Sequence, residues 1–174
     1  ALIAMVGRVT VGKKKYLNVE QEMWRMIEEA ENLRTLLTRA VEEDAASFQG
    51  FLQAMRLPKS TEEEIKTRNE AIETATIFAA RVPYKTAELA KGVLDLSKTA
   101  VELGNINAIS DAVSASNLAI AAIRSAALNV KINLKSLENP AAAGSLAEDV
   151  EGLLHAIPPV ESQIARILQD RAGL

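Results

Sequence analysis

Hydrophobic residues recur every three or four positions along most of this chain, which is the spacing of one face of an α-helix. The longest such run begins after Asn18, where Gln21 would complete a capping-box-like start, and it ends at Pro58. A helix over residues 19–57 would be about 58 Å long at about 1.5 Å per residue. Its apolar stripe is expected to contain Met23, Ile27, Ala30, Leu33, Leu37, Val41, Phe48, Phe51 and Met55.

Turn and capping residues divide the first two thirds of the chain into further helices. Gly12 can serve as the C-cap of a first helical segment. Ser60 or Thr61 can cap a third segment, whose first turn, "EEE", places acids where the helix dipole favours them. Pro83 breaks that pattern and suits the first turn of a fourth helix, which ends at Gly104.

The last third of the chain is also helical in pattern. Residues 106–128 are more than half Ala and Ser, and Pro140 closes this small-faced segment. Ser145 and Glu148 form a capping box for a C-terminal helical segment over residues 145–174. No segment shows a convincing strand pattern, so we predict an all-α, single-domain bundle of five or six helices over residues 1–174, with one long helix in its N-terminal half.

The first ten residues, "ALIAMVGRVT", resemble the second half of a helix, because they begin on an apolar residue without a cap. We therefore expect that the natural protein has residues upstream of them. The chain of 174 residues is long enough to bury a sizeable core, and its low aromatic content of 3 % predicts close packing of small aliphatic side chains.

The amino-acid composition excludes several kinds of chemical site. The chain has no Cys and one His, which excludes disulfides, thiolate metal sites and His-rich metal sites. Composition alone does not exclude a metal bound by carboxylates, but no motif for one is present, so we expect no metal and no redox cofactor. No signal peptide is recognisable and no run of about 20 apolar residues is apparent, so a soluble cytoplasmic protein without membrane contact is expected.

Charge is unevenly distributed along the chain. Residues 1–16 contain Arg8, Lys13, Lys14 and Lys15 and no acid, so the remainder carries −3 − 4 = −7. A nucleic-acid binder would usually show a wider basic surface and more stacking aromatics. We therefore expect no nucleic-acid partner. The "GKKKY" segment, which ends at Tyr16, is either a solvated loop or a local site for a small anionic ligand.

Two sets of polar residues are candidates for chemistry. Asp44 falls on the apolar stripe of the long helix, so it either pairs with a Lys or Arg across a helix interface or serves an active site. Asp111 and Asn129 are 18 residues apart, which is five helical turns, and so share one face with Asn133. Helix capping and inter-helix hydrogen bonds are the alternative for this second set.

Five stretches together resemble the cyclodeaminase/cyclohydrolase family of folate enzymes. They are "VGRVTVGKKKY", "EEDAASFQGFLQAMRLPK", "ARVPYKTAELA", "GNINAISDAVSAS" and "AALNVKINLKSL", and they span about residues 1–138 in the order found in that family. Family members also carry a Gly-rich turn of the Pro-Gly-Gly-Gly-Ser type just before the first helix, a natural anion site that this sequence does not contain.

The resemblance implies a homodimeric helical enzyme that acts on a reduced folate. The leading hypothesis is a cyclodeaminase, a lyase that closes 5-formiminotetrahydrofolate to 5,10-methenyltetrahydrofolate and releases ammonia, as in histidine degradation. The alternative is a methenyltetrahydrofolate cyclohydrolase. A non-catalytic helical module that binds folate or mediates assembly is a second alternative.

On this hypothesis, Asp44 and Asp111 are the expected acid and base, since two carboxylates in different environments can divide proton transfer between them. Side-chain amides would hold the pterin or the folate amide, and the basic loop would meet the anionic glutamate tail, which carries more charge when polyglutamylated. The expected binding residues are Lys13, Lys14, Lys15, Tyr16, Asn105, Asn129 and Asn133.

Overall fold

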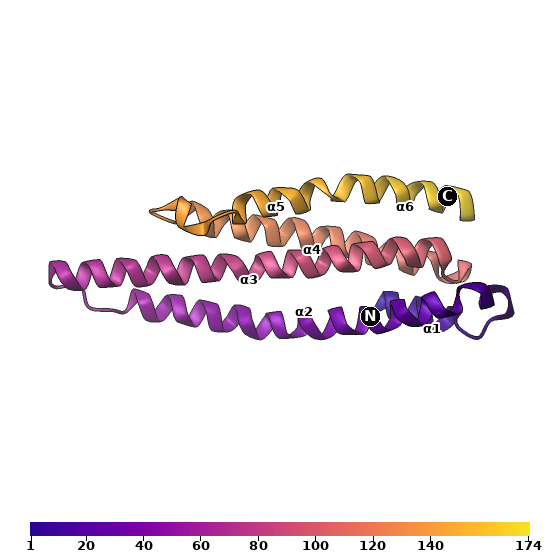
Figure 1. Ribbon diagram of the computed structural model, residues 1–174, viewed down its shortest axis with the longest axis horizontal. Coiled ribbons are helices and arrows are strands. Elements are labelled where there is room, and N and C mark those ends of the chain that lie inside the picture. Colours follow the sequence, from indigo (N-terminus) through magenta and orange to yellow (C-terminus); the bar gives the residue numbers. More distant parts are fainter.

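The computed structural model describes residues 1–174 as an elongated antiparallel bundle of six α-helices, which confirms the predicted all-α fold (Figure 1). The helices are α1 (Leu2–Thr10), α2 (Glu20–Met55), α3 (Glu62–Leu103), α4 (Ile109–Lys135), α5 (Leu146–His155) and α6 (Ile157–Ala172). Three short 3₁₀ helices connect them: η1 (Lys14–Val19), η2 (Ile106–Ala108) and η3 (Pro140–Ala143). The α2–α3 hairpin projects beyond the turn that joins α4 to α5 (Figure 1).

The predicted helix boundary at Pro83 is wrong, because α3 continues through this residue as one helix of 42 residues. A proline has no backbone N–H, so the carbonyl of Ala79, four residues earlier, loses its helical partner. The side-chain amide of Asn133 on α4 donates to that carbonyl at 3.1 Å. The neighbouring helix thus compensates for the break, and α3 does not have to end.

The buried seam of α2 differs from the expected stripe. Val41 and Phe48 are 71 % and 57 % exposed, and Asp44 between them is exposed as well. The first half of the expected stripe is buried, at Met23, Ile27, Ala30 and Leu33. In the second half the buried residues are Ala40, Ser47 and Ala54, each one position before Val41, Phe48 and Met55, so small side chains face the neighbouring helices and the larger ones face outward.

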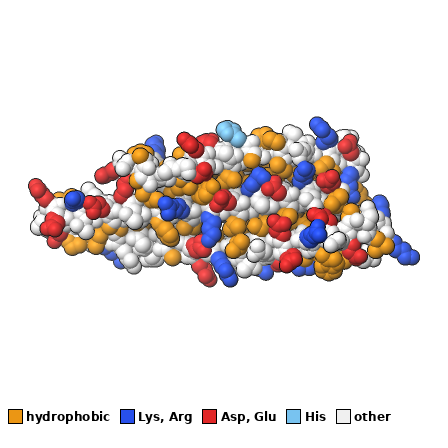
Figure 2. Space-filling model, in the orientation of Figure 1, with side chains coloured by type: hydrophobic (Ala, Val, Ile, Leu, Met, Phe, Trp, Pro, Cys, Tyr) orange, Lys and Arg blue, Asp and Glu red, His pale blue; other side chains and the backbone are white.

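The core lies where α3 and α4 pack between the other helices, and it consists largely of alanine with larger aliphatic residues such as Leu94 and Ile123. Small side chains let the helix axes approach closely, which fits the low aromatic content. On the face shown in Figure 2, charged side chains of both signs are spread over the bundle, with hydrophobic patches between them.

One segment qualifies as a candidate membrane span by length and composition, contrary to the expectation from the sequence. Residues Ile106–Lys135, which include α4, reach a mean hydropathy of 1.3, and 44 % of the most apolar window is buried inside the bundle. An alanine-rich core helix passes the same test, so this is weak evidence for a membrane segment.

Residues far apart in the sequence meet at one corner of the bundle. The Thr10 hydroxyl accepts a hydrogen bond from the Asn105 backbone N–H at 2.8 Å, and the Tyr16 hydroxyl accepts one from the Ile106 N–H at 3.0 Å. Arg171 of α6 donates to the carbonyl of Gly104 at 2.9 Å and to that of Val101. These bonds fix the turn between α3 and α4 against both the first and the last helices.

Candidate active site

A groove runs between α2 and α4, continuing from the N-terminal end of α1. Three adjoining hollows of about 380, 280 and 400 Å³ form it. They are continuous, because Leu37 lines all three while Val93 and Ala122 each line two. The second hollow is wholly apolar, whereas polar side chains line the other two: Arg34 and Thr38 in the first, and Asp44, Thr86, Ser125 and Asn129 in the third.

Asp44 and Asn129 line the same end of this groove, together with Thr86 and Ser125. The Asn129 amide donates to the Ser125 carbonyl at 3.2 Å, so its own carbonyl oxygen stays free for a ligand. Sequence reasoning singled out these two residues on separate helices, and the fold places them in one hollow. The spacing of residues within one helix does not predict which residues of α2 and α4 lie beside each other.

The carboxylate of Asp44 has no ion-pair or hydrogen-bond partner within the chain. Only its backbone carbonyl is engaged, by the Ser47 hydroxyl at 2.8 Å. The neighbouring Glu43 takes the nearby cation instead, with its carboxylate 2.8 Å from the Lys85 ammonium. The structure therefore does not contain the inter-helix ion pair that was one of the two explanations for Asp44.

The other predicted amide and phenol residues have structural partners. Asn133 bonds to the backbone of α3 as described above, and the Asn105 amide donates to the carbonyl of Val9 at 2.9 Å. Tyr16 is buried and its hydroxyl is used at the corner of the bundle. These three residues hold helices together, and none of them lines the groove.

The basic loop and Asp111 lie at the far end of the bundle from Asp44. Tyr16, next to Lys15, contacts η2, and Asn129 is 20 residues beyond Ile109, so about 30 Å separates the loop from the polar end of the groove. Asp111 is half-buried in the first turn of α4, about 27 Å along the helix from Asn129. Within one chain, the two aspartates are therefore not brought together.

Lys13, Lys14 and Lys15 are all exposed. The Lys15 ammonium lies 5.7 Å from the centre of the Tyr16 ring, within the range of a cation–π contact. That contact accounts for one of the three lysines structurally and leaves the others in solvent.

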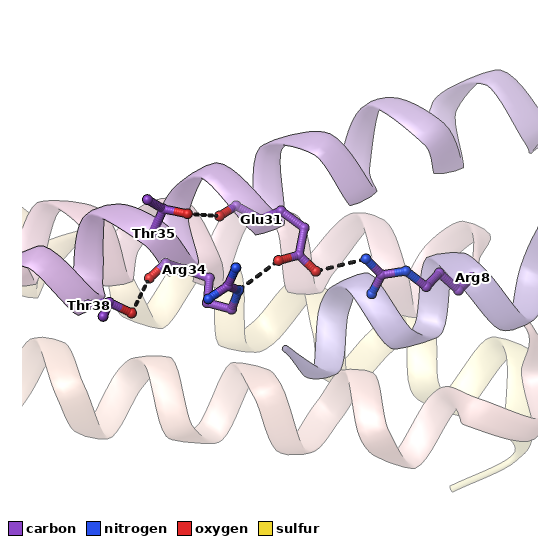
Figure 3. A network of polar contacts seen from close by, with 5 residues as sticks. All are labelled: Arg8, Glu31, Arg34, Thr35 and Thr38. Carbon is purple, nitrogen blue, oxygen red and sulfur yellow. Dashed lines mark hydrogen bonds and ion pairs between the residues drawn. The ribbon is translucent and has the colours of Figure 1, made fainter.

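A polar network stands beside the opposite end of the groove (Figure 3). The carboxylate of Glu31 lies between two guanidinium groups, 2.8 Å from Arg8 of α1 and 2.7 Å from Arg34 of α2. Hydrogen bonds from Arg34 and then Arg8 lower the pKa of Glu31 to about 2, so it stays ionised at neutral pH. Arg34 also lines the groove, with Leu37 and Val41 between it and Asp44 along α2.

Sequence reasoning missed Arg34, Thr86 and Ser125 as groove residues. Ser125 precedes Asn129 by one turn, so helical spacing would have found it, whereas Arg34, ten residues before Asp44, lies about 80° around the helix from it and gave no such signal. Thr86 follows the misassigned boundary at Pro83, which also lines the groove. No group of three or more His, Cys, Asp or Glu side chains with the geometry of a metal site is found.

This arrangement can bind an elongated ligand with an apolar middle. One end offers an unpaired carboxylate and an amide oxygen, which favour a cation or hydrogen-bond donors. The other end offers a guanidinium group, which favours an anion.

Comparison with known proteins gives one consistent family. Residues 1–152 match the model of the family described as formiminotransferase-cyclodeaminase. A methenyltetrahydrofolate cyclohydrolase of Methylorubrum extorquens is 41 % identical over 173 residues, which cover 99 % of this chain and 83 % of that protein.

More distant relatives include the formimidoyltransferase-cyclodeaminase of Rattus norvegicus, 32 % identical over 79 % of this chain but only 25 % of that protein. Among solved structures, the formiminotetrahydrofolate cyclodeaminase of Thermotoga maritima superposes with a TM-score of 0.83 at 28 % identity. That match covers 97 % of this chain and 80 % of the other.

Proposed function

Because the chain belongs to the formiminotransferase-cyclodeaminase family, we propose that it is an enzyme that adds water to 5,10-methenyltetrahydrofolate to give 10-formyltetrahydrofolate. The observation that carries this choice is the 41 % identity to a methenyltetrahydrofolate cyclohydrolase, along 83 % of that protein's length. The formimidoyltransferase-cyclodeaminase of Rattus norvegicus shares a lower identity, over a quarter of its own length.

The polar end of the groove suits this substrate. The methenyl bridge of the folate carries a delocalised positive charge, and Asp44 has a carboxylate without a cation partner. A bound cation would supply that partner, and the carboxylate would stabilise the charge on it. The free carbonyl oxygen of Asn129 can accept a hydrogen bond from the pterin ring.

Asp44 has a defined task in the proposed reaction. It accepts a proton from water as the water oxygen attacks the methenyl carbon, which neutralises the cation and forms a tetrahedral intermediate. The bond from that carbon to N5 then breaks, and protonated Asp44 returns the proton to N5. The hydroxyl proton of the intermediate passes to solvent as the formyl group forms on N10, so one proton is released per turnover.

Cyclodeamination is the second candidate, favoured by the structural match to the Thermotoga maritima protein of that name. N10 would attack the formimino carbon and Asp44 would accept the N10 proton, after which ammonia leaves. A second carboxylate is useful here to protonate the leaving nitrogen. Asp111 could take that role only from a second copy of the chain, given its distance from Asp44.

We also propose that the protein is a homodimer whose copies meet along the groove. Large exposed hydrophobic side chains flank the groove on both walls: Val41 and Phe48 on α2, and Leu118, Leu128 and Ile132 on α4. Exposed hydrophobic residues gathered along one face mark an interaction surface rather than a solvated one. The position of the Gly-rich turn of related enzymes, immediately before the first helix, also adjoins the groove at Ala1.

The test follows the ultraviolet absorbance of the methenyl cation. We expect the wild-type protein to remove the cation faster than buffer does, and Asp44→Asn to lower kcat by about 10²–10⁴-fold. The free energy of unfolding of Asp44→Asn should stay within about 0.5 kcal/mol of wild type, because this carboxylate is exposed and unpaired. The matched control is Glu42→Gln, an exposed acid two residues away that does not line the groove.

Each alternative gives a different result in the same assay. Cation formation and ammonia release from 5-formiminotetrahydrofolate, without accelerated loss of the cation, would replace the cyclohydrolase by the cyclodeaminase. Folate binding without either reaction would leave a non-catalytic binding module.

A further inference from the structure

Arg34 presents unused hydrogen-bond donors at the end of the groove away from Asp44. A guanidinium group has five N–H donors, and the Nε donor of Arg34 is bonded to Glu31 at 2.7 Å. The two terminal nitrogens make no hydrogen bond within the chain, and the residue lines the hollow next to Leu37. Two parallel N–H groups of this kind match the two oxygens of a carboxylate.

The charge balance at this end also favours an anion. Arg8 and Arg34 share the single carboxylate of Glu31, so the trio keeps one net positive charge. No acidic side chain lines the hollow beside Arg34. Glu31 accepts a hydrogen bond from Nε of Arg34 and thereby limits the orientations that the guanidinium group can adopt (Figure 3).

We infer that Arg34 binds the glutamate carboxylate of the folate while Asp44 stands at the one-carbon bridge, an inference that rests on the function proposed above. The two residues are ten positions apart on α2, or about 15 Å between backbones. The methenyl carbon and the nearest glutamate carboxylate are roughly 10 Å apart at ordinary bond lengths, across the flat aminobenzoyl group. The reach of the two side chains covers the difference.

The stretch between Arg34 and Asp44 has the chemistry that this middle section needs. Leu37 and Val41 line it from α2 beside one polar residue, Thr38, and Val93 faces them from α3. An aromatic ring packs favourably on such apolar side chains and gains nothing from polar ones. The basic loop at Lys13–Lys15, about 30 Å from the polar end of the groove, is too far away to hold the same carboxylate within one chain.

The experiment compares two folates, one with and one without the anionic glutamate. One is 5,10-methenyltetrahydrofolate, and the other replaces its glutamate by methylamine, which leaves a neutral amide. Turnover of both is measured with wild type, Arg34→Gln and Arg34→Lys. Binding of non-reactive tetrahydrofolate and of its methylamide is measured by calorimetry on the same proteins. Arg39→Gln is the control, since Arg39 is an exposed arginine of α2 that does not line the groove.

We expect Arg34→Gln to raise KM and Kd for the glutamate form by about 10–100-fold, with kcat changed by less than about threefold, because a charge-assisted bidentate contact is lost. The neutral amide should bind wild type weakly, and Arg34→Gln should not weaken it further. Arg34→Lys should recover part of the lost affinity, because lysine keeps the positive charge but lacks the two parallel N–H donors.

Equal losses for both folates, or no loss for either, would overturn the role of Arg34. If the wild-type protein shows no turnover, but Arg34→Gln binds the glutamate form more weakly and the methylamide equally well, the proposed reaction is refuted and the binding role of Arg34 is supported. Absence of folate binding to the wild-type protein would remove both.

Discussion

Asn133→Ala tests whether the break that Pro83 makes in α3 is compensated from α4. The Asn133 amide donates to the half-buried carbonyl of Ala79 at 3.1 Å, and no helical N–H is available there because residue 83 is proline. Removing the amide leaves that carbonyl without a partner, which should lower the free energy of unfolding by about 1–3 kcal/mol. In Pro83→Ala the backbone N–H of residue 83 can bond to Ala79, so Asn133→Ala should then cost about 0.5 kcal/mol or less.

The measurement is urea unfolding of the wild type, both single variants and the double variant, followed by circular dichroism at one protein concentration. A coupling of about 1–2 kcal/mol between Pro83 and Asn133 is expected. In thermal unfolding, 1 kcal/mol corresponds to about 2–4 °C for a chain of this size. Asn129→Ala is the control, because its amide bonds within its own helix. If Asn133→Ala costs the same with proline or alanine at position 83, the compensation argument is refuted.

Two further predictions concern Glu31 and the exposed wall of the groove. The pKa of Glu31 is about 2 in the fold and about 4.3 in an unfolded chain, so its contribution to stability is complete above pH 5 and lost as the pH falls to about 2. Wild type and Glu31→Gln should therefore differ in free energy of unfolding at pH 6 and converge near pH 2, and a constant difference would contradict the ion pairs. Leu128→Glu should shift the protein from dimer to monomer in sedimentation velocity without loss of helical circular dichroism, and an unchanged dimer would place the interface elsewhere.

Local sequence patterns were sufficient for the helical class and for most helix ends, since caps such as Thr61 act on neighbouring residues. They failed at Pro83, because the donor that lets α3 continue comes from Asn133, 54 residues beyond Ala79. They also misplaced Val41 on the buried side of α2, because the small residues Ala40 and Ser47 face the partner helices there, and hydrophobicity alone selects their larger neighbours.

Only some residues of the candidate site could be predicted from the sequence. Asp44 and Asn129 line one hollow, but the sequence had suggested Asp111 as the companion of Asp44 and had suggested that Asp44 is buried. Asn105 and Tyr16 look the same in sequence whether they bind a ligand or a backbone group, and the fold uses them for the second purpose. Arg34 was overlooked because an arginine on an exposed helix face is common, and only the groove beside it gives it a role.

The corner where Asn105 meets Thr10 has a consequence for the order in which the chain folds. Its contacts join residues 95, 90 and 67 positions apart, through Thr10, Tyr16 and Arg171 respectively. Such contacts form late, because a long loop must close before they stabilise anything. The α2–α3 hairpin has only a short connection to close. During synthesis α2, which forms one wall of the groove, and α3, which lies between α2 and α4, can therefore assemble first. The end of α3 gains partners for the carbonyls of Val101 and Gly104 only afterwards, when α6 has emerged and Arg171 can donate to them.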